Sequence, residues 1–307
     1  MSTEPRSSLA VAADPTLAGS AALAPTRRRR LHAGRKVRRN QFAVVGLSVM
    51  AFFTAFCILG PFIYHTDQVH TSLISANLAP GMGGHVLGTD DFGYDELGRL
   101  MVGGQSSLEV GIVAAILAVV FGALWGAIAG YVGGFVDNLM MRFVDAMIAI
   151  PWLFLLLFLA SITTLNVPLM ILVVAITGWL GPARLIRAES LSLRTRDYVQ
   201  AVRVMGGGAS RIVLRHIVPN AIGTMIVSAT FHVGEAILTV ATLSYLHLGP
   251  PAPSGSWGSM LSNGIQFTLD GYWWMIVPPG IAIILIVLAF NFLGEWLGER
   301  FAGQVTS

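Results

Sequence analysis

Hydrophobic runs separated by polar stretches fill most of the chain after residue 40. Each run carries few charges or none, and at 1.5 Å per helical residue it can cross most or all of about 30 Å of hydrocarbon. The third and fourth runs are divided at Asn166-Val167-Pro168. The pattern predicts an all-α polytopic membrane protein with six transmembrane helices, at 41–64, 110–136, 139–163, 168–186, 217–246 and 273–293.

The polar segments set the expected domain organisation. Residues 1–40 are rich in Ala, Pro and Ser and then strongly basic, which predicts a disordered cytoplasmic arm. Residues 65–105 and 249–270 are punctuated by Pro and Gly, which predicts extracytoplasmic loops. The remaining expected domains are a first helix at 41–64, a core of five helices at 106–298 that includes a basic loop at 187–216, and a cytoplasmic tail at 299–307.

A basic, soluble-looking island at 197–219 interrupts the hydrophobic sequence. Its first half predicts a short amphipathic helix, Asp197–Met205, whose apolar stripe is Tyr198, Ala201, Val202 and Met205. Gly206-Gly207-Gly208 is expected to end this helix, because glycine tolerates left-handed backbone. A helix this short needs a partner for its stripe. Two partners are open at this point, a protein groove or the lipid surface.

Composition and charge fix the expected topology. The chain is 54% hydrophobic and only 11% charged, and its mean hydropathy is +0.70. Of 19 Lys and Arg residues, nine lie in the arm and seven at 181–219, while Arg99 alone falls in a predicted outer segment. The positive-inside rule therefore predicts that both termini and the island face the cytoplasm. The basic arm is expected to touch anionic lipid and not nucleic acid, because no aromatic or groove-reading motif accompanies it.

Charged residues inside the predicted spans are few. Three carboxylates, Glu109, Asp145 and Glu235, are candidates for a translocation path, since charges in lipid are costly and face a wet interior. A structural role for Glu235 remains the alternative, and Asp145 is expected to pair with Arg142, three residues earlier. The sequence contains no G-x-x-x-x-G-K-[ST] phosphate loop and no Ser/His, paired-acid or H-E-x-x-H constellation. A non-catalytic chain without its own cofactor is therefore expected.

The predicted outer loop is acidic. Asp90, Asp91 and Asp95 lie close to His85 in the sequence, which offers oxygen and nitrogen ligands for a metal. The spacing does not match a calcium loop, and local roles explain these residues as well. Asp90 or Asp91 is expected to cap the following helix, and Asp95 to pair with Arg99. No metal site is predicted.

Several stretches resemble the bacterial ABC-importer permeases, specifically the second permease subunit of the dipeptide, oligopeptide and nickel group. The island resembles their E-A-A-x-x-x-G loop followed by I-x-P, here Gln200-Ala201-Val202, Gly206 and Ile217-Val218-Pro219. Gln200 replaces the usual glutamate, and Val202 the second alanine. Further similar stretches within residues 35–300 are His85–Arg99, Gly181–Arg196, Leu243–Leu261 and Val287–Glu295.

The resemblance implies a type I ABC-importer permease fold in a bacterial inner membrane. It implies that the island helix docks on an ATPase subunit, with Tyr198, Gln200, Ala201, Val202, Arg203, Gly206 and Pro219 as coupling residues. The implied partners are a second homologous permease, two ATPase domains or subunits that bind ATP and Mg²⁺, and an extracytoplasmic binding protein. Asp90, Asp91 and Asp95 would then lie where that binding protein docks.

Two functional classes follow. The favoured one is the membrane-spanning subunit of an ATP-driven peptide importer. The alternative is a self-sufficient secondary transporter or channel for a small solute, which would be expected to show repeat symmetry and more ion ligands at mid-membrane.

Overall fold

The computed structural model describes residues 26–162, 166–249 and 255–305. The first 25 residues of the predicted arm, the end of the third run, part of the 249–270 loop and the last two residues lie outside this set. Residues 1–41 and 42–307 form two compact units, and each is described by itself.

The described part of the first unit belongs to helix α1, Thr26–Ile63. Residues 26–40 are therefore helical, and the prediction of a disordered arm is wrong for them. Leu, Ala, Arg and Lys are good helix formers, and they extend a helix that the apolar run has already nucleated. The apolar part of α1, Gln41–Ile63, matches the predicted first span.

The second unit holds the remaining candidate spans. Three stretches of helix are long and apolar enough to cross a membrane, as Gln41–Ile63 is, and two further helix pairs qualify only as bent units. Counting each bent pair as one span gives the predicted six. The stretches are α2 (Glu96–Val132), Ala209–Tyr245 with α9 (Ile222–Tyr245), and Trp273–Phe301 within which α11 (Val277–Val305) begins; the pairs are α3 (Gly134–Ile148) with α4 (Trp152–Ile162), and α5 (Val167–Gly178) with α6 (Leu180–Leu193).

Both bent pairs have a local cause. Pro151 precedes α4, and a proline can neither donate a backbone hydrogen bond nor continue α3, so the two helices meet at 73°. The bend between α5 and α6 is 45° and falls after Gly178. Glycine adds no side chain at the bend. The predicted third and fourth spans are thus kinked rather than straight.

Three predicted boundaries are wrong. Helix α2 begins at Glu96, although its apolar run begins only at residue 110. The predicted loop 249–270 contains helix α10, Trp257–Ile265, which Ser256 and Ser259 close with a capping box. The predicted tail 299–307 continues α11 as far as Val305. Helices α2 and α11 extend past their uncharged cores into polar sequence, and α10 is a separate short helix, so a search for long apolar runs detects none of these boundaries.

Helix α2 lies at the centre of the second unit. It contributes to four separate clusters of buried apolar side chains. The first joins it to α1, α9, α10 and α11, and the second to α4, α5 and α9. The third joins it to α6 and the segment after α6, and the fourth to α3 and α6. At about 1.5 Å per residue its 37 residues span about 55 Å, so its ends project beyond a bilayer core.

Helix α6 packs against a glycine face of α2. A Cβ on Gly122, Gly126 or Gly130 would lie 2.5, 2.2 or 2.7 Å from a backbone carbonyl oxygen of the facing segment. These oxygens belong to Trp179, Ala183 and Arg187, which are also spaced by four. The i+4 glycine repeat therefore lets the two backbones touch.

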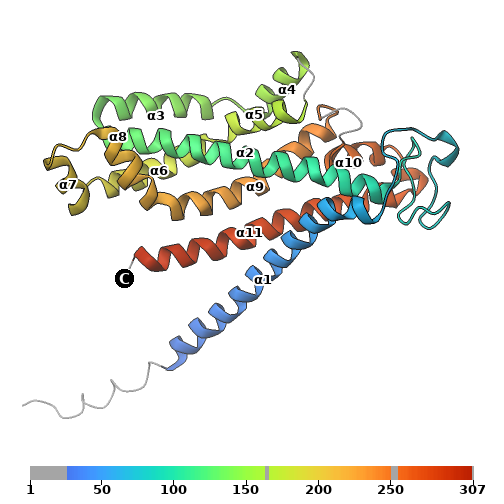
Figure 1. The fold of residues 1–307 in the computed structure, drawn as a ribbon, viewed down its shortest axis with the longest axis horizontal. Coiled ribbons are helices and arrows are strands. Elements are labelled where there is room, and N and C mark those ends of the chain that lie inside the picture. The colour runs from blue at the N-terminus through green and yellow to red at the C-terminus, as the bar shows by residue number, and fades with distance from the viewer. Residues whose placement is uncertain (1–25, 163–165, 250–254, 306–307) are drawn as a thin grey trace, which may run out of the picture. The chain divides into compact units, whose positions relative to one another are not determined.

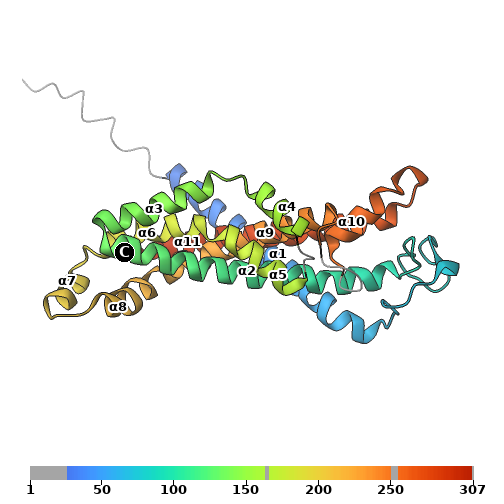
Figure 2. The same cartoon turned by 90° about the horizontal axis from the view of Figure 1, so that it is seen from above.

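The island and the acidic loop lie at opposite ends of the second unit (Figures 1 and 2). Helices α7 (Asp197–Val204) and α8 (Ala209–Ile212) mark one end. The segment 64–95 and α10 mark the other. Three candidate spans, α2 and the two bent pairs, separate the segment 64–95 from α7 in the sequence, and an odd number of crossings places them on opposite sides, as the predicted topology requires.

Replacing Gly126 with alanine tests the α2–α6 contact. The new methyl group would meet the Ala183 carbonyl oxygen, which belongs to backbone and cannot rotate away. We expect a loss of about 1–3 kcal/mol in the free energy of unfolding, measured by denaturation in detergent. Gly280→Ala is the matched control, because its methyl group would be 3.7 Å from the flexible end of Leu261. Equal stability of the two variants would contradict the contact.

Candidate functional site

Helix α7 forms the tip of the island. It begins at Asp197, as predicted, and ends at Val204 with Met205 as its C-cap, one residue before the predicted end. Gly206 follows with a φ of +81°, the left-handed conformation that ends helices, and nothing lies within 4 Å of the position of a Cβ there. Gly206 therefore serves the backbone turn and does not make room for a neighbouring side chain.

The side of α7 that faces the bundle differs from the predicted stripe. Val199 is buried and Val202 is partly buried, and both pack on a cluster that includes Ile186, Ile212 and Ile217. Val199 was not among the predicted residues. It lies three positions before Val202, so one face of the helix is held by the chain itself.

The rest of the predicted stripe points away from the chain. Tyr198 is 42% exposed, Met205 78%, and the neighbouring Val204 86%; Ala201 and Arg203 are also exposed. The Tyr198 ring lies 6.4 Å from the ring of His216. This apolar surface at the tip of a short helix is the kind of patch that a partner covers.

The other predicted coupling residues have local structural roles. The Gln200 side-chain amide donates to the backbone carbonyl of Arg194 at 2.8 Å. A glutamate at this position would be unable to donate that hydrogen bond when ionised. Pro219 is exposed and starts a short 3₁₀ helix, η4 (Pro219–Ala221), after the π-helical turn η3 (Val213–Ile217).

Polar contacts fasten the helix that leads into α7. The Arg187 guanidinium donates to both carboxylate oxygens of Asp137, at 2.6 and 2.7 Å, which joins α6 to α3. Ser190 and Arg194 donate to backbone carbonyls of α2, those of Ala127 and Gly130, each at 3.1 Å. Because α6 is tied to α2 along its length, the base of α7 is fixed to the bundle.

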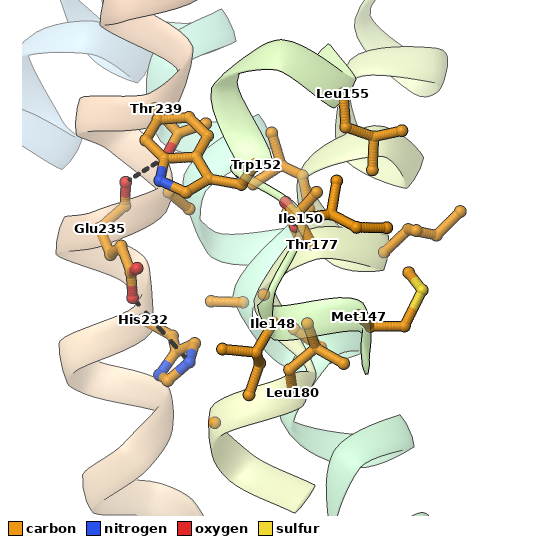
Figure 3. A pocket seen from close by; sticks show the side chains of 18 residues that line it. Met147, Ile148, Ile150, Trp152, Leu155, Thr177, Leu180, His232, Glu235 and Thr239 are labelled. Atoms are coloured by element: carbon orange, nitrogen blue, oxygen red, sulfur yellow. Dashed lines mark hydrogen bonds and ion pairs between the residues drawn. The ribbon is translucent and has the colours of Figure 1, made fainter. Parts of the chain in front are cut away.

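A cavity of about 320 Å³ lies beside the two helix bends. Its walls come from α2, from both bent pairs and from α9, and Figure 3 shows Glu235 and His232 of α9 facing side chains around the bends. The remaining lining is largely apolar. A cavity of this size, with a few polar groups, matches a small-molecule site.

Of the three carboxylates predicted for a translocation path, Glu235 lines this cavity. Glu109 is exposed on α2 and does not line it, and neither does Asp145. The expected Asp145–Arg142 pair is wrong, because the Asp145 carboxylate accepts from Arg184 on α6. A contact within one helix was predicted where the tertiary fold offers a partner 39 residues away.

At the opposite end, the expected roles of the outer acids are exchanged. Asp95 caps α2, since its Oδ1 accepts from the backbone N–H of Gly98 at 2.7 Å. Its Oδ2 lies 2.8 Å from both the Tyr64 hydroxyl and the His85 Nδ1. Asp90, not Asp95, pairs with Arg99.

These contacts decide which acids are available to a partner. Asp90 and Asp95 are each only 2% exposed, and the contacts described above bind them to groups of this same chain, at residues 64–99. Asp91 is partly exposed, and burial together with the neighbouring Asp90 carboxylate raises its pKa above the ordinary value. Among the described residues, no group of three or more His, Cys, Asp and Glu side chains is arranged to hold a metal ion.

Two models of known protein families match most of the chain. Residues 118–306 match the family model described as binding-protein-dependent transport system inner membrane component. Residues 32–80 match the N-terminal TM domain of oligopeptide transport permease C. The second match covers most of α1 and the start of the acidic segment, and the first covers α7, the last spans and all of the cavity lining except Ala114 and Ala115.

Similar proteins include transport permeases of two bacteria. The dipeptide transport system permease protein of Bacillus subtilis strain 168 is 35% identical over 267 residues, 87% of this chain and 83% of that protein. The oligopeptide transport system permease protein of the same strain is 37% identical over 86% of each chain. Its counterpart in Escherichia coli K12 is 38% identical over 87% of this chain and 88% of that protein.

Two ion pairs of different burial give a test of this geometry. The Arg99 and Asp90 side chains are 13% and 3% exposed, whereas those of Arg184 and Asp145 are 49% and 57% exposed. Arg99→Met would leave a buried carboxylate without its cation, and we expect a loss of about 3–5 kcal/mol in unfolding free energy. Arg184→Met is expected to cost about 1 kcal/mol or less. Chemical denaturation in detergent measures both, and a larger loss for Arg184→Met would refute the assignment.

Proposed function

The chain belongs to the family of binding-protein-dependent transport system inner membrane components, and from this premise we propose that it is the membrane-spanning permease subunit of an ATP-driven peptide importer. The observation that carries the peptide assignment is the similarity, over 86–87% of the chain, to permeases named for dipeptide and oligopeptide transport. The cavity at the helix bends supports a path for a solute of modest size.

In this proposal α7 is the element that contacts the ATPase. An ATPase subunit covers the exposed Tyr198, Val204 and Met205, and ATP and Mg²⁺ are bound by that partner and not by this chain. Val199 and the ties of α6 pass a displacement of α7 to the helix bends, where the cavity lies. The chain catalyses no chemical step. Its contribution is a two-state change in helix packing.

The remaining partners follow from the same assignment. A second, homologous permease completes the path, two ATPase domains or subunits drive it, and an extracytoplasmic binding protein delivers substrate at the end that carries residues 64–95. We place the chain in the bacterial plasma membrane with both termini in the cytoplasm, because its Lys and Arg residues concentrate in the arm and the island.

Reconstitution tests the proposal. The chain is purified with the permease, ATPases and binding protein that accompany it and placed in proteoliposomes. We expect peptide uptake that requires ATP and all partners. Uptake by this chain alone along an ion gradient would instead establish a secondary transporter.

Substitution of Gly206 tests the motor contact. Gly206→Val forces a β-branched residue into left-handed backbone, which costs about 1–3 kcal/mol and disturbs the end of α7. We expect ATP hydrolysis to continue while peptide uptake falls at least about tenfold, with membrane insertion unchanged. Gly208→Val is the matched control, because Gly208 has a φ of −67° and no atom near its Cβ position. Normal uptake by Gly206→Val would count against α7 as the coupling element.

A further inference from the structure

We propose that the cavity beside the helix bends binds a primary ammonium group between the Glu235 carboxylate and the His232 imidazole. The inference rests on the proposed function only in identifying this ammonium as part of a peptide, its free amino terminus or a lysine side chain. The binding chemistry itself follows from the two side chains and the walls around them.

The tautomer of His232 determines what it can offer. Its Nδ1 lies 2.9 Å from the backbone carbonyl oxygen of Ser228. A carbonyl can only accept, so in the neutral ring Nδ1 carries the hydrogen and Nε2 is an acceptor. Nε2 lies 3.9 Å from the Oε2 atom of Glu235, too far for a hydrogen bond and with no proton to share. Two acceptors thus face the same space.

The other polar groups of the cavity do not satisfy these acceptors. The hydroxyl of Thr239 donates to the backbone carbonyl of Glu235 at 2.9 Å. The hydroxyl of Thr177 donates within its own helix, to the carbonyl of Val174 at 3.0 Å. His232 and Glu235 are the titratable side chains in the lining, and no lysine or arginine lines the cavity.

The position of Glu235 requires a compensating group. Its side chain is 73% exposed although it lies in the middle of the apolar stretch that contains α9. An ionised carboxylate is costly against lipid, so it must meet water, a partner or a cation. A primary ammonium has three donors, and its nitrogen can reach about 2.9 Å from both acceptors at once.

The walls leave space for such a group. A Cβ on Gly181 would lie 3.8 Å from His232 Nε2, and the glycine leaves this approach open. Trp152 of α4 is 46% exposed and projects toward the Glu235–Thr239 stretch of α9 (Figure 3). An aromatic ring beside a carboxylate favours cations. The apolar remainder of the lining suits the carbon atoms that follow the ammonium.

Thiol labelling in the assembled transporter tests the site without transport. Cys57, which is buried, is replaced by alanine, and Thr177→Cys places one thiol in the cavity. The thiol is reacted with 2-aminoethyl methanethiosulfonate, which carries a primary ammonium, and with its anionic 2-sulfonatoethyl analogue. Labelling of this chain is followed by mass spectrometry. We expect the rate ratio of cationic to anionic reagent to fall about tenfold when Glu235→Gln is added.

Glu295→Gln is the control for this measurement. It removes an exposed carboxylate from α11 that does not line the cavity, so the labelling ratio should not change. The cation site is overturned if the ratio of labelling rates does not change with Glu235→Gln, or if it falls equally with Glu295→Gln.

Peptide uptake tests the role toward substrate. Initial uptake of trialanine by the complete transporter should fall about tenfold with Glu235→Gln, the loss expected for a charge-assisted hydrogen bond, and remain near the parent rate with Glu295→Gln. Acetyl-Ala-Lys-Ala distinguishes a lysine ammonium from an amino terminus as the bound group. Full-rate uptake of both peptides by Glu235→Gln overturns the inference. Absence of peptide uptake by the parent transporter, with a labelling ratio that depends on Glu235, would refute the peptide importer and leave the cation site standing.

Discussion

The backbone contact between α2 and α6 is the constraint on which the other features depend. Gly122, Gly126 and Gly130 bring the facing carbonyl oxygens so close that no side chain fits between the helices. The first turn of α6 lines the cavity, and its last turn leads to α7. A close-packed pair of helices moves as one body, because packed interiors switch between arrangements and do not deform continuously. The distance between the tip and the cavity is therefore bridged by a rigid element.

Ion pairs fix polar segments of the chain that apolar packing does not fix. The Arg187–Asp137 fork joins α6 to α3 near the island, and Arg99–Asp90 fixes the acidic segment at the other end. Among the ion pairs of the described residues, Glu235 has only His232, whose Nε2 lies 3.9 Å away and is cationic only when the ring is protonated. Asp137 and Asp90 thus have arginine partners, whereas Glu235 is exposed at the cavity without one, and that difference separates a framework charge from a binding charge.

Sequence reasoning succeeded where one local property decided the structure. The apolar runs predicted the six crossings, and Gly206 the end of α7. It failed where tertiary partners decided. Val199 and the predicted stripe lie on adjacent faces of α7. Which of these faces is buried depends on the direction in which α7 leaves α6. The partner of Asp145 and the exchange of Asp90 and Asp95 likewise depend on residues distant in sequence or on loop geometry.

The exposed tip of α7 has a consequence for the life of the chain before assembly. Val204 and Met205 are exposed over most of their surface. Such a surface attracts chaperones and proteases, which act on uncovered apolar side chains. In the proposed importer an ATPase subunit covers this surface, so a copy without that subunit would display a degradation signal. Degradation of surplus copies would then keep the number of these chains close to the number of ATPase subunits.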